Sequence, residues 1–94
     1  MKEKSYSYPL NPDWTPDEMV TVINFFNAVE DAYETGCDRD KFMDNYRKFQ
    51  NVVGSKMGEK QLGREFKDVS GYDYYQVVKL AQSSSQKKLK MVGD

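Results

Sequence analysis

The segment WTPDEMVTVINFFNAVEDAYETG, residues 14–36, decides the fold because it carries the marks of a long helix with two defined ends. Thr15 is suited to the N-cap, with Pro16 in the first helical position and Glu18 in the third. Gly36 offers the left-handed residue that closes such a helix. The sequence therefore predicts a helix from Thr15 to about Gly36.

Apolar residues cover a wide arc of this helix. They recur at i, i+3, i+4 and i+7, and further apolar residues widen the stripe. The stripe comprises Met19, Val22, Ile23, Phe26, Val29 and Tyr33, widened by Val20, Phe25, Ala28 and Ala32. Such a helix needs cover on more than one side, so we expect the other elements to pack around it.

Three shorter helices are predicted downstream. The first runs over residues 38–53, where apolar residues repeat at helical spacing, and Gly54 followed by Ser55 gives a short turn. The next covers about residues 56–70, and the last runs from about residue 72 or 73 to Ala81. We predict an all-α fold, a single-domain bundle of about four helices with a helical core over residues 15–81.

The two ends of the chain are predicted to be non-helical. Residues 1–14 interleave aromatic residues with prolines, which favours an extended arm. We expect this arm to lie across the bundle with its rings inward. The alternative is an exposed aromatic surface for a partner, formed by Tyr6, Tyr8 and Trp14. Residues 82–94, rich in serine and then lysine, are predicted to form a flexible basic tail.

Composition narrows the class of protein. Ninety-four residues suffice for one domain, and contents of 38% hydrophobic and 14% aromatic residues favour folding over disorder. No apolar run approaches the roughly 18 residues of a membrane span, and the N-terminus lacks the apolar segment of a signal peptide. We therefore expect a cytoplasmic protein that does not contact membranes.

Residue types that usually perform catalysis are scarce. There is no histidine, Cys37 is the single cysteine, and no phosphate-binding glycine motif occurs. We expect no catalytic residue, no metal, no cofactor and no enzymatic activity. Glu30 and Glu34 lie one helical turn apart with Asp31 alongside, a spacing that can hold a cation or share a proton. We interpret them as a solvated acidic face, and Cys37 as an unreactive thiol.

A basic stripe marks the helix predicted over residues 56–70. Its cationic residues fall within a sector of roughly 80°, away from the apolar face. They are Lys56, Lys60, Arg64 and Lys67. Three interpretations stay open: a solvated face, a contact for phosphate or nucleic acid, and a contact for an acidic protein surface. The sequence pI near 5.4 disfavours nucleic acid.

Several motifs together resemble uncharacterised protein family 0223 (UPF0223), a family of small bacterial proteins. The resemblance covers about residues 6–81 and rests on NFFNAVEDAYETG (24–36), YRKF (46–49), REF (64–66) and VSGY (69–72). It implies a compact helical fold and a cytoplasmic setting. It assigns no activity, ligand or catalytic residue.

Two hypotheses of function lead, ahead of a third, an enzyme that uses the carboxylates of Glu30 and Glu34 alone. The first is a non-enzymatic helical module that binds another protein or a second copy of itself, because the predicted apolar and aromatic surface exceeds what so short a chain readily buries. The alternative is helix-turn-helix-like binding of nucleic acid or phosphate through the basic stripe.

Overall fold

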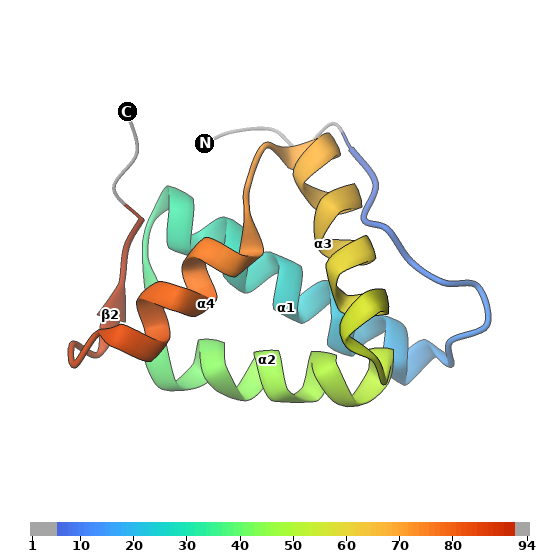
Figure 1. Ribbon diagram of the computed structural model, residues 1–94, viewed down its shortest axis with the longest axis horizontal. Helices are drawn as coiled ribbons and strands as arrows, with labels where there is room; N and C mark the ends of the chain where they lie inside the picture. Colours follow the sequence, from blue (N-terminus) through green and yellow to red (C-terminus); the bar gives the residue numbers. More distant parts are fainter. Residues whose placement is uncertain (1–5, 92–94) are drawn as a thin grey trace.

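Four helices and one very short sheet form the protein in this computed structural model, which describes residues 6–91. In chain order the elements are α1 (Pro16–Glu34), β1 (Cys37–Asp38), α2 (Arg39–Val53), α3 (Lys56–Ser70), α4 (Tyr74–Ser83) and β2 (Lys88–Leu89). In Figure 1, α2 runs along the long axis of the molecule and α3 stands steeply across its end. Residues 1–5 of the predicted arm and 92–94 of the predicted tail lie outside the described residues.

The helix ends follow the local sequence. Thr15 Oγ1 accepts a hydrogen bond from the amide of Glu18, and Glu18 Oε1 accepts one from the amide of Thr15, which confirms the predicted capping box. Gly54 ends α2 in the left-handed conformation, with φ of 81°. Ser55 then caps α3 through a hydrogen bond from the amide of Gly58. The turn between α2 and α3 is therefore as short as predicted.

A cluster of phenylalanines forms the centre of the core. The ring of Phe25 stacks on Phe49 with centroids 4.4 Å apart, and Phe26 stacks on Phe66 at 4.3 Å. All four side chains are fully buried. The predicted wide apolar face of α1 is buried at Val22, Phe25, Phe26, Ala28, Val29 and Ala32. Met19, Ile23 and Tyr33 are half-buried, and Val20 is 53% exposed.

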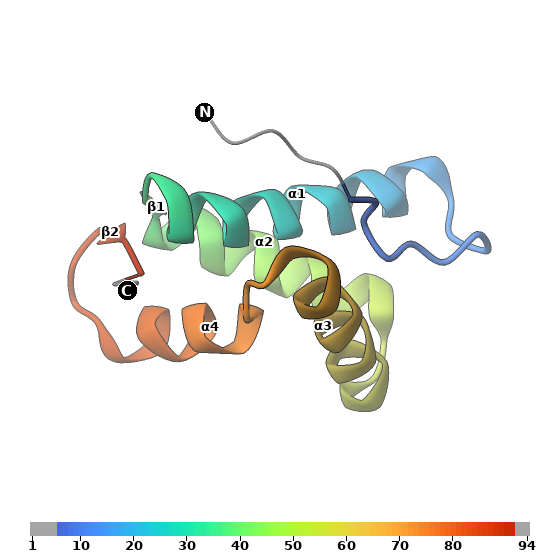
Figure 2. The ribbon, with the colours of Figure 1, turned by 90° about the horizontal axis from the view of Figure 1, so that it is seen from above.

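The N-terminal arm lies across α1 and α3 with its aromatic rings inward, as predicted for its described part. The Tyr8 ring packs 6.1 Å from both Phe26 and Phe66, measured between centroids, and Tyr6 meets Phe66 edge-on at 6.2 Å. Trp14 is partly buried against the same core. Figure 2 shows the arm passing beside the first turns of α1. The arm therefore supplies cover that the helices alone do not provide.

The prediction of a flexible tail from Gln82 onward was wrong for most of the described segment. Helix α4 continues to Ser83, and β2 then pairs antiparallel with β1, placing Leu89 opposite Cys37. The Leu89 side chain is 1% exposed, and the amide of Met91 donates to the carbonyl of Ala32 at 2.8 Å. The alternation of lysines with Leu89 and Met91 explains the change, because period two turns both apolar side chains to one side.

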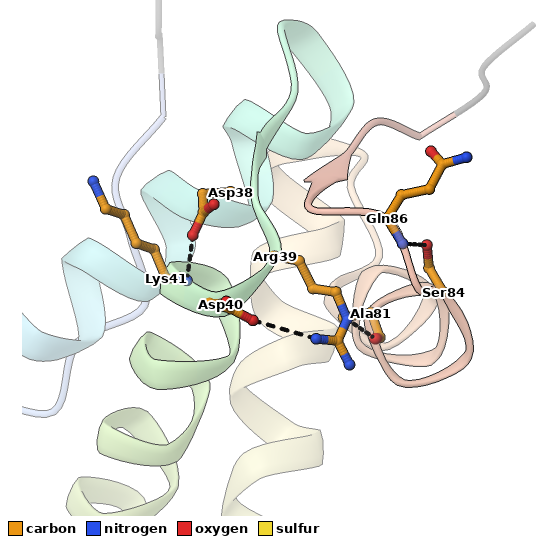
Figure 3. Close-up of polar contacts among 7 residues, drawn as sticks. All are labelled: Asp38, Arg39, Asp40, Lys41, Ala81, Ser84 and Gln86. Atoms are coloured by element: carbon orange, nitrogen blue, oxygen red, sulfur yellow. Dashed lines mark hydrogen bonds and ion pairs between the residues drawn. The ribbon is translucent and has the colours of Figure 1, made fainter.

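Arg39, the first residue of α2, contacts both α4 and the residue before β2. Its Nε donates to the carbonyl of Ala81 at 2.7 Å, near the C-terminal end of α4, as Figure 3 shows. Its backbone amide donates to the carbonyl of Lys87. These contacts fix the C-terminal segment against the helices, so the fold is an all-α bundle closed by a two-stranded sheet.

Candidate functional site

The clearest concave site among the described residues is a groove beside α3, which we call the α3 groove. It has a volume of about 640 Å³ and lies between α3 and the first turn of α4. Its lining residues are Lys56, Glu59, Lys60, Gly63, Arg64, Lys67, Asp73, Tyr74 and Tyr75. All four members of the predicted basic stripe therefore line one groove.

Gly63 lets α4 approach α3 closely enough to form this groove. A Cβ atom at Gly63 would lie 2.1 Å from Cε1 of Tyr74, well inside van der Waals contact. The missing side chain therefore makes room for the Tyr74 ring, which is 6% exposed. The glycine weakens the helix locally but allows a packing that alanine would block.

The four cations of the groove differ in their internal pairing. Lys56 Nζ lies 3.9 Å from Glu59 Oε1, and Lys67 Nζ lies 3.8 Å from Asp73 Oδ2. Lys60 and Arg64, one helical turn apart and both exposed, form no ion pair with any residue in the range 6–91. Two positive charges on the groove wall are thus available to an anionic ligand.

One of the lining residues is a buried carboxylate that is hydrogen-bonded to α2. Glu59 is 3% exposed, and its Oε2 accepts hydrogen bonds from Tyr46 at 2.6 Å and Tyr74 at 2.9 Å. Gln50 Nε2 donates to the other oxygen at 3.3 Å. Burial, and next the hydrogen bond to Glu59, raise the pKa of both tyrosines above its ordinary value, so they stay protonated as donors.

A second buried carboxylate corrects the interpretation of the acidic face on α1. Glu30 is 1% exposed and accepts hydrogen bonds from Tyr6 and, at 2.9 Å, from Tyr8. Its neighbours differ: Asp31 is exposed, and Glu34 is exposed while accepting from Tyr72 at 2.7 Å. The solvated face was therefore wrong for Glu30, because the arm folds over it.

The aromatic residues proposed as a partner surface serve this inward arrangement. Tyr6 and Tyr8 contact Glu30 and the phenylalanine core, and Trp14 packs at the start of α1. None of the three lines the α3 groove. The structure therefore gathers the basic stripe in the groove, whereas Tyr6 and Tyr8 meet at Glu30 with ring centroids 6.1 Å apart.

The remaining sequence candidates show no reactive arrangement. Burial, and then repulsion from Asp31 and Asp38, raises the pKa of the Cys37 thiol to about 11, so the thiolate is disfavoured. Between residues 6 and 91, no group of three or more His, Cys, Asp or Glu side chains is placed to hold a metal ion. No helix in that range is long and apolar enough to span a bilayer.

Sequence reasoning missed the roles of Glu59, Tyr74 and Asp73 in the groove. Glu59 falls three residues before Leu62 and seven before Phe66, which places it on the apolar side of α3. That spacing was a signal of burial. The position of α4 beside α3 follows from the close contact at Gly63, which has no signature in the spacing of apolar residues.

The family comparison and the individual relatives all point to one protein family. Residues 5–90 match the family described as "Uncharacterised protein family (UPF0223)". A UPF0223 protein of Listeria monocytogenes serotype 4a is 48% identical over 86 residues, covering 92% of this chain and 96% of the relative. One from Enterococcus faecalis is 48% identical over 91 residues, covering 97% and 99%. The chain therefore belongs to the UPF0223 family.

Proposed function

We propose that this protein is a non-enzymatic binding module whose α3 groove accepts an acidic segment of a partner protein. The observation that carries the proposal is the pair Lys60 and Arg64, two exposed cations on the groove wall that lack an ion pair within the described chain. Arginine binds carboxylates through two parallel hydrogen bonds, and lysine contributes a mobile point charge. An acidic side chain matches both.

The rest of the groove suits a polypeptide. Tyr75, 50% exposed, offers an aromatic face at the edge, and Tyr74 forms part of the wall. Aromatic residues that are partly exposed are common anchors at protein interfaces. A segment that alternates acidic and apolar residues can therefore use the cations and the rings together.

Nucleic acid fits the same groove less well. Glu59 and Asp73 add two carboxylates to its lining, and the whole chain has a formal net charge of −1. A continuous phosphate backbone is repelled by such carboxylates and gains most from strongly basic domains. The first helical turn of α4 lies beside the basic stripe, so it also restricts the entry of α3 into the major groove of DNA.

The original reason for expecting self-association is weakened. The apolar face of α1 is covered within one chain by α2, by the arm and by β2. The large hydrophobic residues that stay exposed in the described chain are scattered over several elements: Leu10, Val20, Met57, Val69 and Tyr75. A second copy is therefore not part of the proposal.

A peptide-display selection tests the proposal. Short random peptides are selected on the immobilised protein, with a Lys60→Gln/Arg64→Gln variant for counter-selection. We expect acidic peptides to be enriched, and their affinity for the double variant to fall about three- to tenfold, the combined effect of two exposed charge contacts. The matched control is Lys41→Gln/Lys48→Gln, which removes two charges from α2, outside the groove.

Two results would contradict the proposal. Selected peptides without acidic residues, or acidic peptides that bind the Lys60→Gln/Arg64→Gln variant as tightly as the native protein, exclude an acidic segment in this groove. A duplex or single-stranded oligonucleotide that binds with steep salt dependence, and only to the native protein, would favour the nucleic-acid alternative.

A further inference from the structure

A second groove lies on the other part of α4 and extends the cationic surface. We call it the α4 groove. It has a volume of about 610 Å³ and is lined by Gln76, Lys79, Leu80, Gln82, Ser83, Lys90 and Met91. The described residues that line it include two lysines and no carboxylate. Leu80 and Met91 give it apolar surface between the polar side chains.

Lys79 connects the two grooves. Its Nζ lies 5.8 Å from the centroid of the Tyr75 ring, which lines the α3 groove, while Lys79 itself lines the α4 groove. Tyr75, Lys79 and Ser83 follow one another at four-residue intervals, so they form one row along α4. A ligand that leaves the α3 groove over Tyr75 therefore meets Lys79 next.

Positive charge is concentrated on the surface that the α3 groove and the α4 groove form together. The α3 groove is lined by four cations and two carboxylates, and the α4 groove by two cations. Exposed lysine and arginine side chains therefore dominate both walls, although the chain as a whole is slightly acidic. The positive electrostatic potential of these side chains attracts an anionic segment along the length of both grooves.

We propose that both grooves form one continuous site for an extended acidic segment of a partner protein, which crosses α4 at Lys79 and ends beside Lys90. This inference rests on the proposed function of the α3 groove and adds the length and path of the ligand. The row from Tyr75 to Ser83 is about 12 Å long at the rise of an α-helix. About four residues of extended chain cover that distance.

The test uses a short acidic peptide selected on the α3 groove and the same peptide lengthened by about four residues at either end, the length expected from the rise of an extended chain. Each extension is made in two versions, one in which the added residues are glutamates and one in which they are glutamines. We expect the glutamate extension at one end to raise affinity about three- to tenfold, the combined effect of two exposed charge contacts. The glutamine extension should give little gain.

Variants locate the effect. Lys79→Gln/Lys90→Gln should remove the gain from the glutamate extension and leave the short peptide unaffected, whereas Lys41→Gln/Lys48→Gln should keep the gain. Because Lys90 Nζ also donates to the carbonyl of Glu34, Lys79→Gln alone serves as a second variant that leaves this hydrogen bond intact. Circular dichroism verifies the fold of each variant.

The outcomes separate the two proposals. A short peptide that binds without any gain from the glutamate extension overturns the continuous site and leaves the proposed function standing. A gain that persists in both lysine variants also overturns it. If no acidic peptide binds the α3 groove, the proposed function itself is wrong. Length-dependent binding of an oligonucleotide in place of the peptide would make nucleic acid the occupant.

Discussion

Two buried glutamates hold different parts of this molecule in similar ways. Glu30 and Glu59 are 1% and 3% exposed, and each accepts hydrogen bonds from two tyrosines. They differ in where the donors come from. The tyrosines at Glu30 belong to the extended arm, whereas those at Glu59 belong to α2 and α4.

The two carboxylates therefore differ in what they connect. Glu59 is a junction between three helices, whereas Glu30 attaches the arm to α1. At Glu59, three helices meet on one carboxylate, and Tyr74 and Lys56 also line the α3 groove. At Glu30, hydrogen bonds hold the arm over Phe26 of α1 and Phe66 of α3. We therefore expect perturbation of Glu59 to affect stability and the groove, and perturbation of Glu30 to act mainly on the arm.

The largest effect is expected for Glu59→Gln. The amide keeps the shape of the side chain but removes the charge that strengthens the hydrogen bonds from Tyr46 and Tyr74. We expect the free energy of unfolding to fall by about 2–3 kcal/mol, measured by urea denaturation. The control is Glu65→Gln, an exposed position on the same helix, which should change stability by less than about 0.5 kcal/mol. Equal effects would show that Glu59 is not a junction.

Glu30→Gln should lower the free energy of unfolding by less, about 1–2 kcal/mol, because the tyrosines that donate to Glu30 come from the arm rather than from packed helices. It should also increase the rate at which a protease cleaves between residues 6 and 14 under native conditions, since the arm loses part of its attachment. Limited proteolysis with mass spectrometry measures this. A loss of stability as large as that of Glu59→Gln would remove the distinction between the two sites.

A double-mutant cycle compares coupling within and between the sites. Tyr46→Phe and Tyr74→Phe each remove one donor to the same oxygen, so their effects of about 1 kcal/mol should be non-additive by at least about 0.5 kcal/mol. Tyr46→Phe combined with Tyr8→Phe crosses between sites and should be additive within about 0.5 kcal/mol. Additivity within the Glu59 site would contradict a shared carboxylate.

The smallest effect is expected from pH, and only under alkaline conditions. Burial, and then the hydrogen bond to Glu34, raises the pKa of Tyr72 to about 12, and burial chiefly raises the pKa of Tyr46 and Tyr74 further. Above the unfolded tyrosine value of about 10, the unfolded chain binds fewer protons than the folded one, so stability falls as pH rises. Below that value the full contribution is present.

Urea denaturation between about pH 8 and pH 11, on either side of the unfolded tyrosine pKa, measures this slope. Tyr46→Phe/Tyr74→Phe should flatten it more than Tyr72→Phe does, because the double variant removes two tyrosines with raised pKa values and Tyr72→Phe removes one. An identical slope in all variants would assign the alkaline loss of stability to other groups.

The sequence predicted the helices well because their signals are local. The capping box at Thr15 and the glycine at Gly54 act within a few residues of themselves, and the basic stripe depends only on helical spacing. The path of the C-terminal segment depends on a distant partner, since Leu89 is buried only when β2 pairs with β1. Its short alternation of lysine with Leu89 and Met91 was too brief to outweigh a lysine-rich composition.

The buried glutamates show a second limit. Glu30 lies four residues after Phe26 and three before Tyr33, so it falls on the apolar stripe of α1, as Glu59 does on α3. The charge of each glutamate favours exposure to solvent, whereas its spacing from the apolar residues favours burial. The tyrosines that resolve this conflict come from elsewhere in the chain, so the sequence alone gave no partner for either carboxylate.

The closure of the C-terminal segment against the helices affects how the protein is handled. Met91 lines the α4 groove, and a polypeptide joined to the chain within four residues after Met91 begins at most about 14 Å from it. An acidic solubility tag placed there would compete in cis for Lys79 and Lys90 at a high effective concentration. Pull-down experiments with such a fusion would then miss the partners they were meant to find.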